Sequence, residues 1–208
     1  MFSICATIIP SGKLEEELKS MAEAESKFNR DLGVLRRNFY QCIDQPHIIW
    51  TITEWTSEKA HNVAAHGIMK VRTDDRVASA YFQPGLYLEF FAKELPETAC
   101  IRDLEAAPGL VVICHGIVAS KKIEAWNKRI KATGEVLAAK RGLLRSRIFY
   151  NYYNSTHFWG LMEWSGREGY EEDRMVGEIT VEEFTFVSGL RSELAAYNQY
   201  YCAPLSLE

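Results

Sequence analysis

The second half of the chain repeats the first at a constant spacing, and this repeat restricts the possible folds more than any other feature. A shift of 109 residues places Trp50 on Trp159 and Trp55 on Trp164. Tryptophan occupies only 5 of the 208 positions, so two such coincidences are not expected by chance. The same register also matches Ile4-Cys5 with Ile113-Cys114, Ser11 with Ser120, Gly33 with Gly142, Leu35-Arg36 with Leu144-Arg145, and Glu54 with Glu163. We therefore expect a first unit at residues 1–95, a linker at 96–108 and a second unit at 109–208.

Within each unit the spacing of the hydrophobic residues changes in a fixed order. The first unit reads as a strand, a helix capped by Ser11, a hairpin, a helix that starts at Ser57 and continues past His66, and a last strand. The predicted ranges are strands at 2–9, 34–43, 47–55 and 86–91 and a further short helix at 74–81, with second-unit strands at 111–118, 143–153 and 157–164. The order βαββαβ is that of the ferredoxin-like fold.

A ferredoxin-like unit carries its helices on one face of the sheet only, so the other apolar face needs a cover. We expect an α+β fold in which two tandem ferredoxin-like units pack their antiparallel sheets into an intramolecular barrel. The second unit has an additional segment with apolar residues at helical spacing. These residues are Val181, Phe184, Val187, Leu190 and Leu194.

Composition excludes several classes of protein. The chain is 47% hydrophobic and 25% charged, as in ordinary globular proteins. Five widely spaced cysteines without a CxxC pair argue against a zinc site or a disulfide framework. The net charge of −4 gives little support to binding nucleic acid. No apolar run is long enough to cross a membrane, and no leader pattern is present, so we expect a cytoplasmic protein with no membrane partner.

One stretch of the first unit resembles a known family. Residues 48–60, which end in Glu54-Trp55-Thr56-Ser57-Glu58-Lys59-Ala60, are similar to the strand end and helix start of the antibiotic biosynthesis monooxygenases. That family belongs to the dimeric α+β barrel superfamily, and the order of elements matches across both units. The second unit keeps Glu163-Trp164, but Gly169-Tyr170 replaces Ala60-His61. The resemblance implies cofactor-independent oxygenation of aromatic molecules, haem degradation or isomerisation as candidate activities.

The residues argue against haem as a cofactor. The resemblance implies that a haem-degrading member needs an Asn, a Trp and an iron-ligating His at set positions. The first unit has Cys5, Ala64 and Asp74 there, and the second unit has Cys114, Asp173 and Glu183. A carboxylate does not replace a neutral imidazole as an axial haem ligand. We expect no cofactor and no metal.

His115 is the candidate catalytic residue, because it lies in an otherwise apolar predicted strand. Alternation places it on the same face as Ile113 and Ile117 and opposite Cys114. A buried imidazole with a suitable pKa can act as a general base. The alternative is a structural histidine with a hydrogen-bonded partner.

Aromatic and thiol side chains are the candidate substrate contacts, since a flat aromatic ligand suits a cleft lined by such groups between each sheet and its helices. The candidates are Cys5, Trp55, His61, Cys114, Trp164 and Tyr170. Both cysteines also fit as plain core residues. Arg36 and Arg145 are possible partners for an anionic substrate.

Two functions stay open from the sequence. The first is a cofactor-independent monooxygenase-like protein that acts on a small aromatic or hydrophobic molecule. The second is a ligand-binding or stress-related barrel without catalysis. We expect either a monomeric pseudo-dimer or a homodimer of fused barrels.

Overall fold

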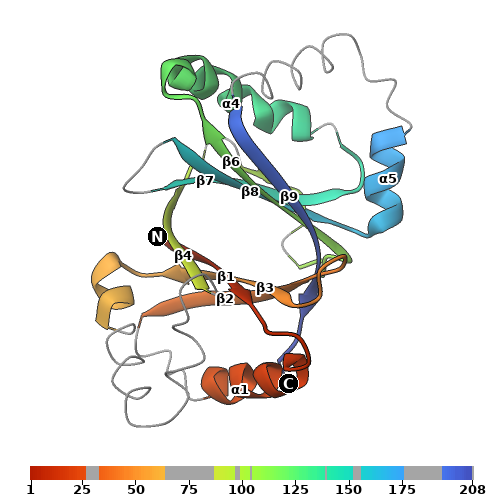
Figure 1. Cartoon of the computed structure of the whole chain (residues 1–208). Helices are drawn as coiled ribbons and strands as arrows, with labels where there is room; N and C mark the ends of the chain where they lie inside the picture. The colour runs from red at the N-terminus through yellow and green to blue at the C-terminus, as the bar shows by residue number, and fades with distance from the viewer. Residues whose placement is uncertain are drawn as a thin grey trace. The chain divides into compact units, whose positions relative to one another are not determined.

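The computed structural model describes residues 1–26, 33–63, 87–96, 99–103, 105–138, 140–151, 156–175 and 194–207 (Figure 1). The chain divides into two compact units. Unit 1 contains Met1–Ala92 together with Pro204–Glu208, and unit 2 contains Lys93–Ala203. The end of the chain therefore belongs to unit 1, whereas the repeat places it in the second unit.

Unit 1 is an α+β unit with a four-stranded antiparallel sheet. Its strand order β4-β1-β3-β2 is that of the ferredoxin-like fold. A further helix occupies 58–63, where Ser57 caps it by accepting a hydrogen bond from the Ala60 backbone N–H at 3.1 Å. The other elements are β1 (Phe2–Ile8), α1 (Leu14–Ser26), β2 (Val34–Cys42), β3 (Ile48–Trp55) and β4 (Tyr87–Glu94).

Unit 2 repeats this strand order as β9-β6-β8-β7. A short strand, β5 (Cys100–Ile101), pairs with β7 at the edge, so part of the predicted linker is a strand. The other elements are β6 (Leu110–Val118), the 3-10 turn η3 (Ser120–Lys122), α4 (Ile123–Ala138), β7 (Leu143–Asn151), β8 (His157–Trp164), α5 (Arg167–Met175) and β9 (Leu194–Leu205). The predicted fold class, α+β with two ferredoxin-like units, is confirmed. The closing of the two sheets into one barrel stays a prediction.

Equivalent backbone hydrogen bonds occur at equivalent positions of the two units. The N–H of Thr56 donates to the carbonyl of Gly33 at 2.9 Å, and the N–H of Ser165 donates to the carbonyl of Gly142 at 3.0 Å. Gly33 has a φ of +83°, and a Cβ there would lie 2.6 Å from Thr56 Oγ1. A Cβ on Gly142 would lie 2.8 Å from the backbone of Gly169. Both glycines are thus required where the chain passes close to the helix that follows the third strand.

One face of each sheet packs against the helices of the same unit. We call this face the helix-facing face. In unit 1, Met21 of α1 packs with Ile9 and Ile49. In unit 2, Trp126 of α4 packs with Phe158 among other residues, and Figure 1 shows α4 lying across β6 and β8. Side chains alternate between the two faces of a strand, so this packing assigns every other residue to the helix-facing face.

Several sequence predictions concern residues outside the described ranges. These are the part of the second helix beyond residue 63, the short helix at 74–81 and the segment from Val181 to Leu190. Leu194 was expected to continue a helix, but it begins strand β9. Residues 197–201 contain three tyrosines and pair with β6, and aromatic residues favour strands. None of the helices in the described ranges has the length and hydropathy of a membrane span.

Candidate functional site

The helix-facing face of unit 2 brings three of the predicted substrate contacts together. Trp164 ends β8, and Tyr170 follows on α5 with its ring edge-on to the indole at 5.2 Å. The short connection places Tyr170 there, because its N–H donates to the carbonyl of Gly166 at 3.2 Å in the first turn of the helix. Cys114 of β6 belongs to the same apolar cluster. The other members of this cluster are Leu110, Val112 and Leu143, with Met162 and Tyr201 packed against them.

The hydroxyls of two tyrosines and the side-chain amide of a glutamine are hydrogen-bonded to one another beside this cluster. The hydroxyl oxygens of Tyr170 and Tyr201 lie 3.2 Å apart. Gln199 donates from Nε2 to the Tyr201 hydroxyl at 3.0 Å and to the Tyr170 hydroxyl at 3.3 Å. The sequence analysis did not predict Gln199 or Tyr201 as site residues. The available signal was the tyrosine content of residues 197–201, because aromatic residues favour strands and the repeat requires a fourth strand.

Two buried polar atoms on the same face have no hydrogen-bond partner among the described residues. They are Nε1 of Trp164 and Oγ of Ser146, whose side chains are 4% and 1% exposed. Ser146 lies on the helix-facing face because its register partner is Met162. Buried polar groups are nearly always paired, so an orphan donor is a candidate ligand contact.

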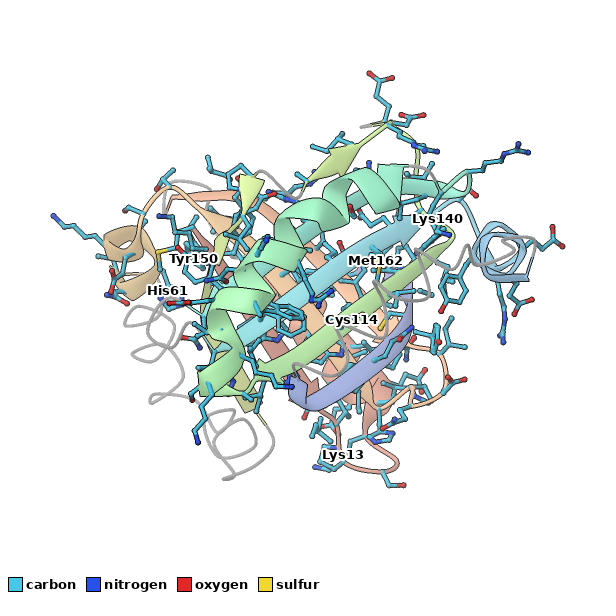
Figure 2. All side chains as sticks on the ribbon, turned by 90° about the horizontal axis from the view of Figure 1, so that it is seen from above. Lys13, His61, Cys114, Lys140, Tyr150 and Met162 are labelled. Atoms are coloured by element: carbon cyan, nitrogen blue, oxygen red, sulfur yellow. The ribbon has the colours of Figure 1, made fainter. Side chains whose placement is uncertain are left out.

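The middle of this face has room for an added group. A Cβ on Gly160 would lie 3.6 Å from Cβ of Cys114 and within 4 Å of no other described atom. A Cβ on Gly116, further along the same face, would lie 2.2 Å from the ring of Phe158. Figure 2 shows Cys114 and Met162 on the sheet face that α4 crosses. Among the described side chains, the face is therefore filled near Gly116 and leaves room for a methyl group at Gly160, in contact with Cys114.

Unit 1 builds a different environment at the equivalent positions. Trp55 and His61 meet edge-on at 4.9 Å, as Trp164 and Tyr170 do in unit 2. Trp55 donates from Nε1 to Oγ of Ser3 at 2.9 Å, and the buried His61 lies with Nδ1 3.3 Å from Oδ1 of Asn62. Cys5 is buried on the same face by register. The two helix-facing sites are thus unequal, and the indole of unit 1 is hydrogen-bonded.

Arg37 adds charge to the unit 1 site. It takes the position of Ser146 in the repeat and donates to Oγ1 of Thr53 at 3.1 Å and to Glu25 of α1 at 2.7 Å. The unit 1 site is therefore charged and internally bonded, whereas the unit 2 site is neutral and aromatic.

The candidate base His115 lies away from these residues. Its register partner is Trp159, which places it on the face opposite Cys114, as predicted. The ring stacks on Trp159 at 4.9 Å and lies 5.8 Å from the ring of His157. Burial, with a smaller contribution from the charge of His157, lowers the pKa of His115. The structure does not bring His115 together with Trp164 and Tyr170.

Arg145, expected as a possible partner for an anionic substrate, pairs with a carboxylate of its own sheet. It is buried, and its Nε donates to the buried Glu163 at 2.5 Å. The equivalent residue in unit 1, Arg36, is exposed.

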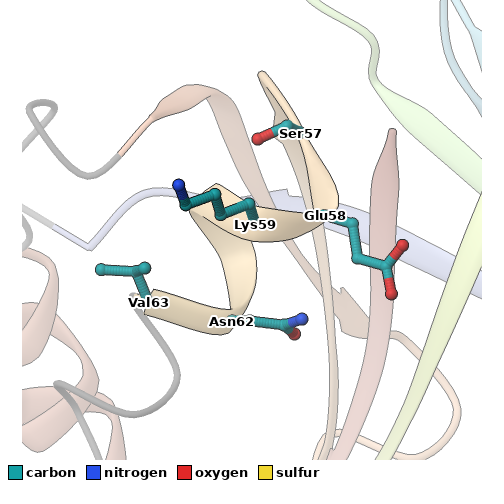
Figure 3. A pocket seen from close by; sticks show the side chains of 5 residues that line it. All are labelled: Ser57, Glu58, Lys59, Asn62 and Val63. Carbon is teal, nitrogen blue, oxygen red and sulfur yellow. The ribbon is translucent and has the colours of Figure 1, made fainter.

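A separate pocket of about 770 Å³ lies against the helix at 58–63 (Figure 3). Its described lining is mostly exposed and includes no predicted site residue. His61 of the same helix is buried instead. The lining residues are Ser57, Glu58, Lys59, Asn62 and Val63. Within the described ranges, no group of three or more His, Cys, Asp or Glu side chains is placed to hold a metal ion.

Comparison with known proteins identifies the fold of this chain but does not identify its function. No family model and no curated protein matches the chain. Among solved structures, a candidate monooxygenase from Fusobacterium nucleatum is similar over 99% of this chain and 92% of its own, with a TM-score of 0.72 and 12% identity. An anthrone oxidase-like protein is similar over 99% and 91%, with a TM-score of 0.67 and 10% identity.

A ferredoxin-fold protein from Listeria monocytogenes, related to antibiotic biosynthesis monooxygenases, is similar over 99% of this chain and 96% of its own. Its TM-score is 0.55 and its identity is 11%. The structural neighbours thus include proteins described as monooxygenases or as related to antibiotic biosynthesis monooxygenases. At these identities the similarity establishes a shared fold, and the function has to be argued from the site.

Proposed function

We propose that this protein is a cofactor-independent monooxygenase-like enzyme that acts on a small aromatic molecule at the helix-facing face of unit 2. The observation that carries the proposal is the room that the described side chains leave at Gly160 beside Cys114, with the ring pair Trp164 and Tyr170 in the same apolar cluster. An apolar surface with a few convergent polar groups is the usual form of a small-molecule site.

The polar atoms favour a substrate that carries oxygen. Nε1 of Trp164 and Oγ of Ser146 are donors that a carbonyl or phenolate oxygen would satisfy. Of the hydroxyls of Tyr170 and Tyr201, one donates to the other, and the remaining hydrogen can be donated to a second substrate oxygen. Donors held in an apolar surrounding stabilise an anion more strongly than the same donors in water.

The reaction that fits such a site needs only the substrate and oxygen. An activated ring CH₂ flanked by phenol or ketone groups loses a proton to solvent, and the resulting carbanion donates an electron pair. A C–O bond to dioxygen forms, the O–O bond then breaks, and one oxygen leaves as water. The balance is CH₂ plus O₂ to C=O plus H₂O. In this scheme the side chains bind and orient the anion.

The structural neighbours support this choice at the level of fold. They include a candidate monooxygenase and an anthrone oxidase-like protein. Their descriptions apply to those proteins, and an anthrone is a reasonable first probe for this one.

The test is oxygen uptake by the purified chain with a panel of anthrones, which carry the activated ring CH₂. We expect one O₂ consumed for each molecule of substrate, with one atom of ¹⁸O₂ in the product. Gly160→Val fills the open position and should lower the rate at least 10-fold, since it removes room that the substrate ring needs. Thr51→Val, at the equivalent position of unit 1, is the matched control and should keep the rate.

A ligand-binding role without catalysis is the second outcome of the same experiment. It predicts no oxygen uptake, but a rise in melting temperature with the same probes that Gly160→Val removes and Thr51→Val keeps. Absence of both turnover and stabilisation across the panel would overturn the proposed site.

A further inference from the structure

The face of unit 2 opposite α4 carries a second group of chemistry-bearing side chains. In the register of β6 and β8, His115 pairs with Trp159, and Ile117 pairs with His157. His115 and His157 are therefore diagonal neighbours on one face of the sheet. Their ring centroids are 5.8 Å apart, with the ring planes tilted by 36°.

A distance of 5.8 Å between the ring centroids allows two imidazoles to bind the same metal ion. With metal–nitrogen bonds of about 2.0–2.1 Å, each ring centre lies roughly 3 Å from the metal, so rings up to roughly 6 Å apart can bind the same ion. Trp159 stacks on His115 with an interplanar angle of 18°, which restricts the orientation of that ring before any ion binds. The geometry is therefore partly preorganised.

The ring of His157 also suits a ligand. Nδ1 of His157 is buried and has no hydrogen-bond partner among the described residues. Such an atom is costly to leave without a partner.

We propose that His115 and His157 form a two-histidine site for a divalent transition metal of the Cu²⁺, Ni²⁺ or Zn²⁺ class. Imidazole ligands suit these ions, whereas Ca²⁺ and Mg²⁺ prefer oxygen. Among the described residues no third His, Cys, Asp or Glu completes a metal cluster. Water or a small anion completes the coordination, so the bound ion keeps exchangeable positions.

The nearby charged groups do not compete for this role. On the same face, β7 contributes Arg147, whose guanidinium is paired with Glu94 through two hydrogen bonds of 2.6 and 2.7 Å. That carboxylate is therefore engaged. Arg145 and Glu163 lie on the same face by register and pair with each other.

The test uses the chain without added histidines, freed of metal by chelation and titrated with Cu²⁺ by calorimetry. We expect one tight site per chain and an electron paramagnetic resonance spectrum with hyperfine structure from two imidazole nitrogens. His115→Gln and His157→Gln should each weaken this site at least 10-fold. His47→Gln, at an exposed histidine of unit 1, is the matched control and should leave binding unchanged.

The spectrum of the unaltered chain decides the question even if a variant fails to fold. Fewer than two nitrogens on the bound Cu²⁺, or no site tighter than millimolar, would overturn the proposal. Equal weakening by His47→Gln would do the same. The oxygenase proposal is tested separately, since it predicts activity in the metal-free chain and in both histidine variants.

Discussion

Nε of Arg145 lies 2.5 Å from Oε2 of Glu163, and both side chains are buried between neighbouring strands of unit 2. The repeat places Arg36 opposite Glu54 in unit 1, where the arginine is exposed. Removing one partner of a buried ion pair leaves an uncompensated charge, which costs about 3–5 kcal/mol.

Glu163→Ala should therefore lower the free energy of unfolding by about 3 kcal/mol, and Glu54→Ala by less than about 1 kcal/mol. Urea unfolding of both variants at neutral pH measures the difference. Equal losses would show that the burial of Arg145 has no energetic consequence.

The two glycines of the unit 2 sheet should respond in opposite ways to an added methyl group. Gly116→Ala places Cβ 2.2 Å from the ring of Phe158, which is held by Trp126 at 4.4 Å. Overpacking of this kind costs about 1–3 kcal/mol. Gly160→Ala meets only Cβ of Cys114 at 3.6 Å and should leave stability unchanged or raise it by up to about 1 kcal/mol. Thermal unfolding separates the two variants, and a large loss in Gly160→Ala would show that the site is already filled.

Two buried hydroxyls should differ in their contribution to stability. Oγ of Ser3 accepts the indole N–H of Trp55, so Ser3→Ala leaves a buried donor without a partner and should cost about 1–3 kcal/mol. Oγ of Ser146 has no partner among the described residues, so Ser146→Ala should cost nothing and can stabilise the fold. Chemical denaturation of both variants is the measurement. A loss in Ser146→Ala as large as that in Ser3→Ala would contradict this assignment.

The stability of the protein should fall in mild acid because of His115. Its pKa in the folded state is lowered from 6.5, first by burial and then by His157, so the unfolded chain binds a proton more readily. Stability from the neutral ring is present above pH 6.5 and is lost as the pH falls through that value. The other titratable or charged groups on this face are His157 on β8, Arg147 paired with Glu94, Arg145 paired with Glu163, and Tyr200 and Cys202 on β9.

His115→Gln should therefore reduce the difference between the urea midpoints at pH 7.5 and pH 5.5. His47→Gln is the control and should keep that difference. An unchanged pH dependence in His115→Gln would assign the acid sensitivity to other groups.

Much of the site could be predicted because the repeat fixes equivalent positions. The edge-on pairs Trp55–His61 and Trp164–Tyr170 occupy the same place in the two units, and all four residues were predicted as substrate contacts, although their pairing was not. The residues that contact these ring pairs could not be predicted in the same way. Gln199 and Tyr201 reach Tyr170 from a strand about 30 residues later in the chain, and local periodicity says nothing about such contacts. The burial of Arg145 against Glu163 likewise depends on strand register rather than on residue type.

Hydrophobic periodicity and side-chain alternation are local properties, and they were enough to predict two ferredoxin-like units, most of their strands, and the opposite faces of Cys114 and His115. They did not predict β5 or β9, whose pairing partners lie elsewhere in the chain. Tertiary packing determines which polar atoms have no partner among the described residues, where a glycine leaves room, and that His157 lies beside His115. Those features depend on how strands distant in sequence come into register and on how closely the helices pack, and neither is encoded in the spacing of residues along one element.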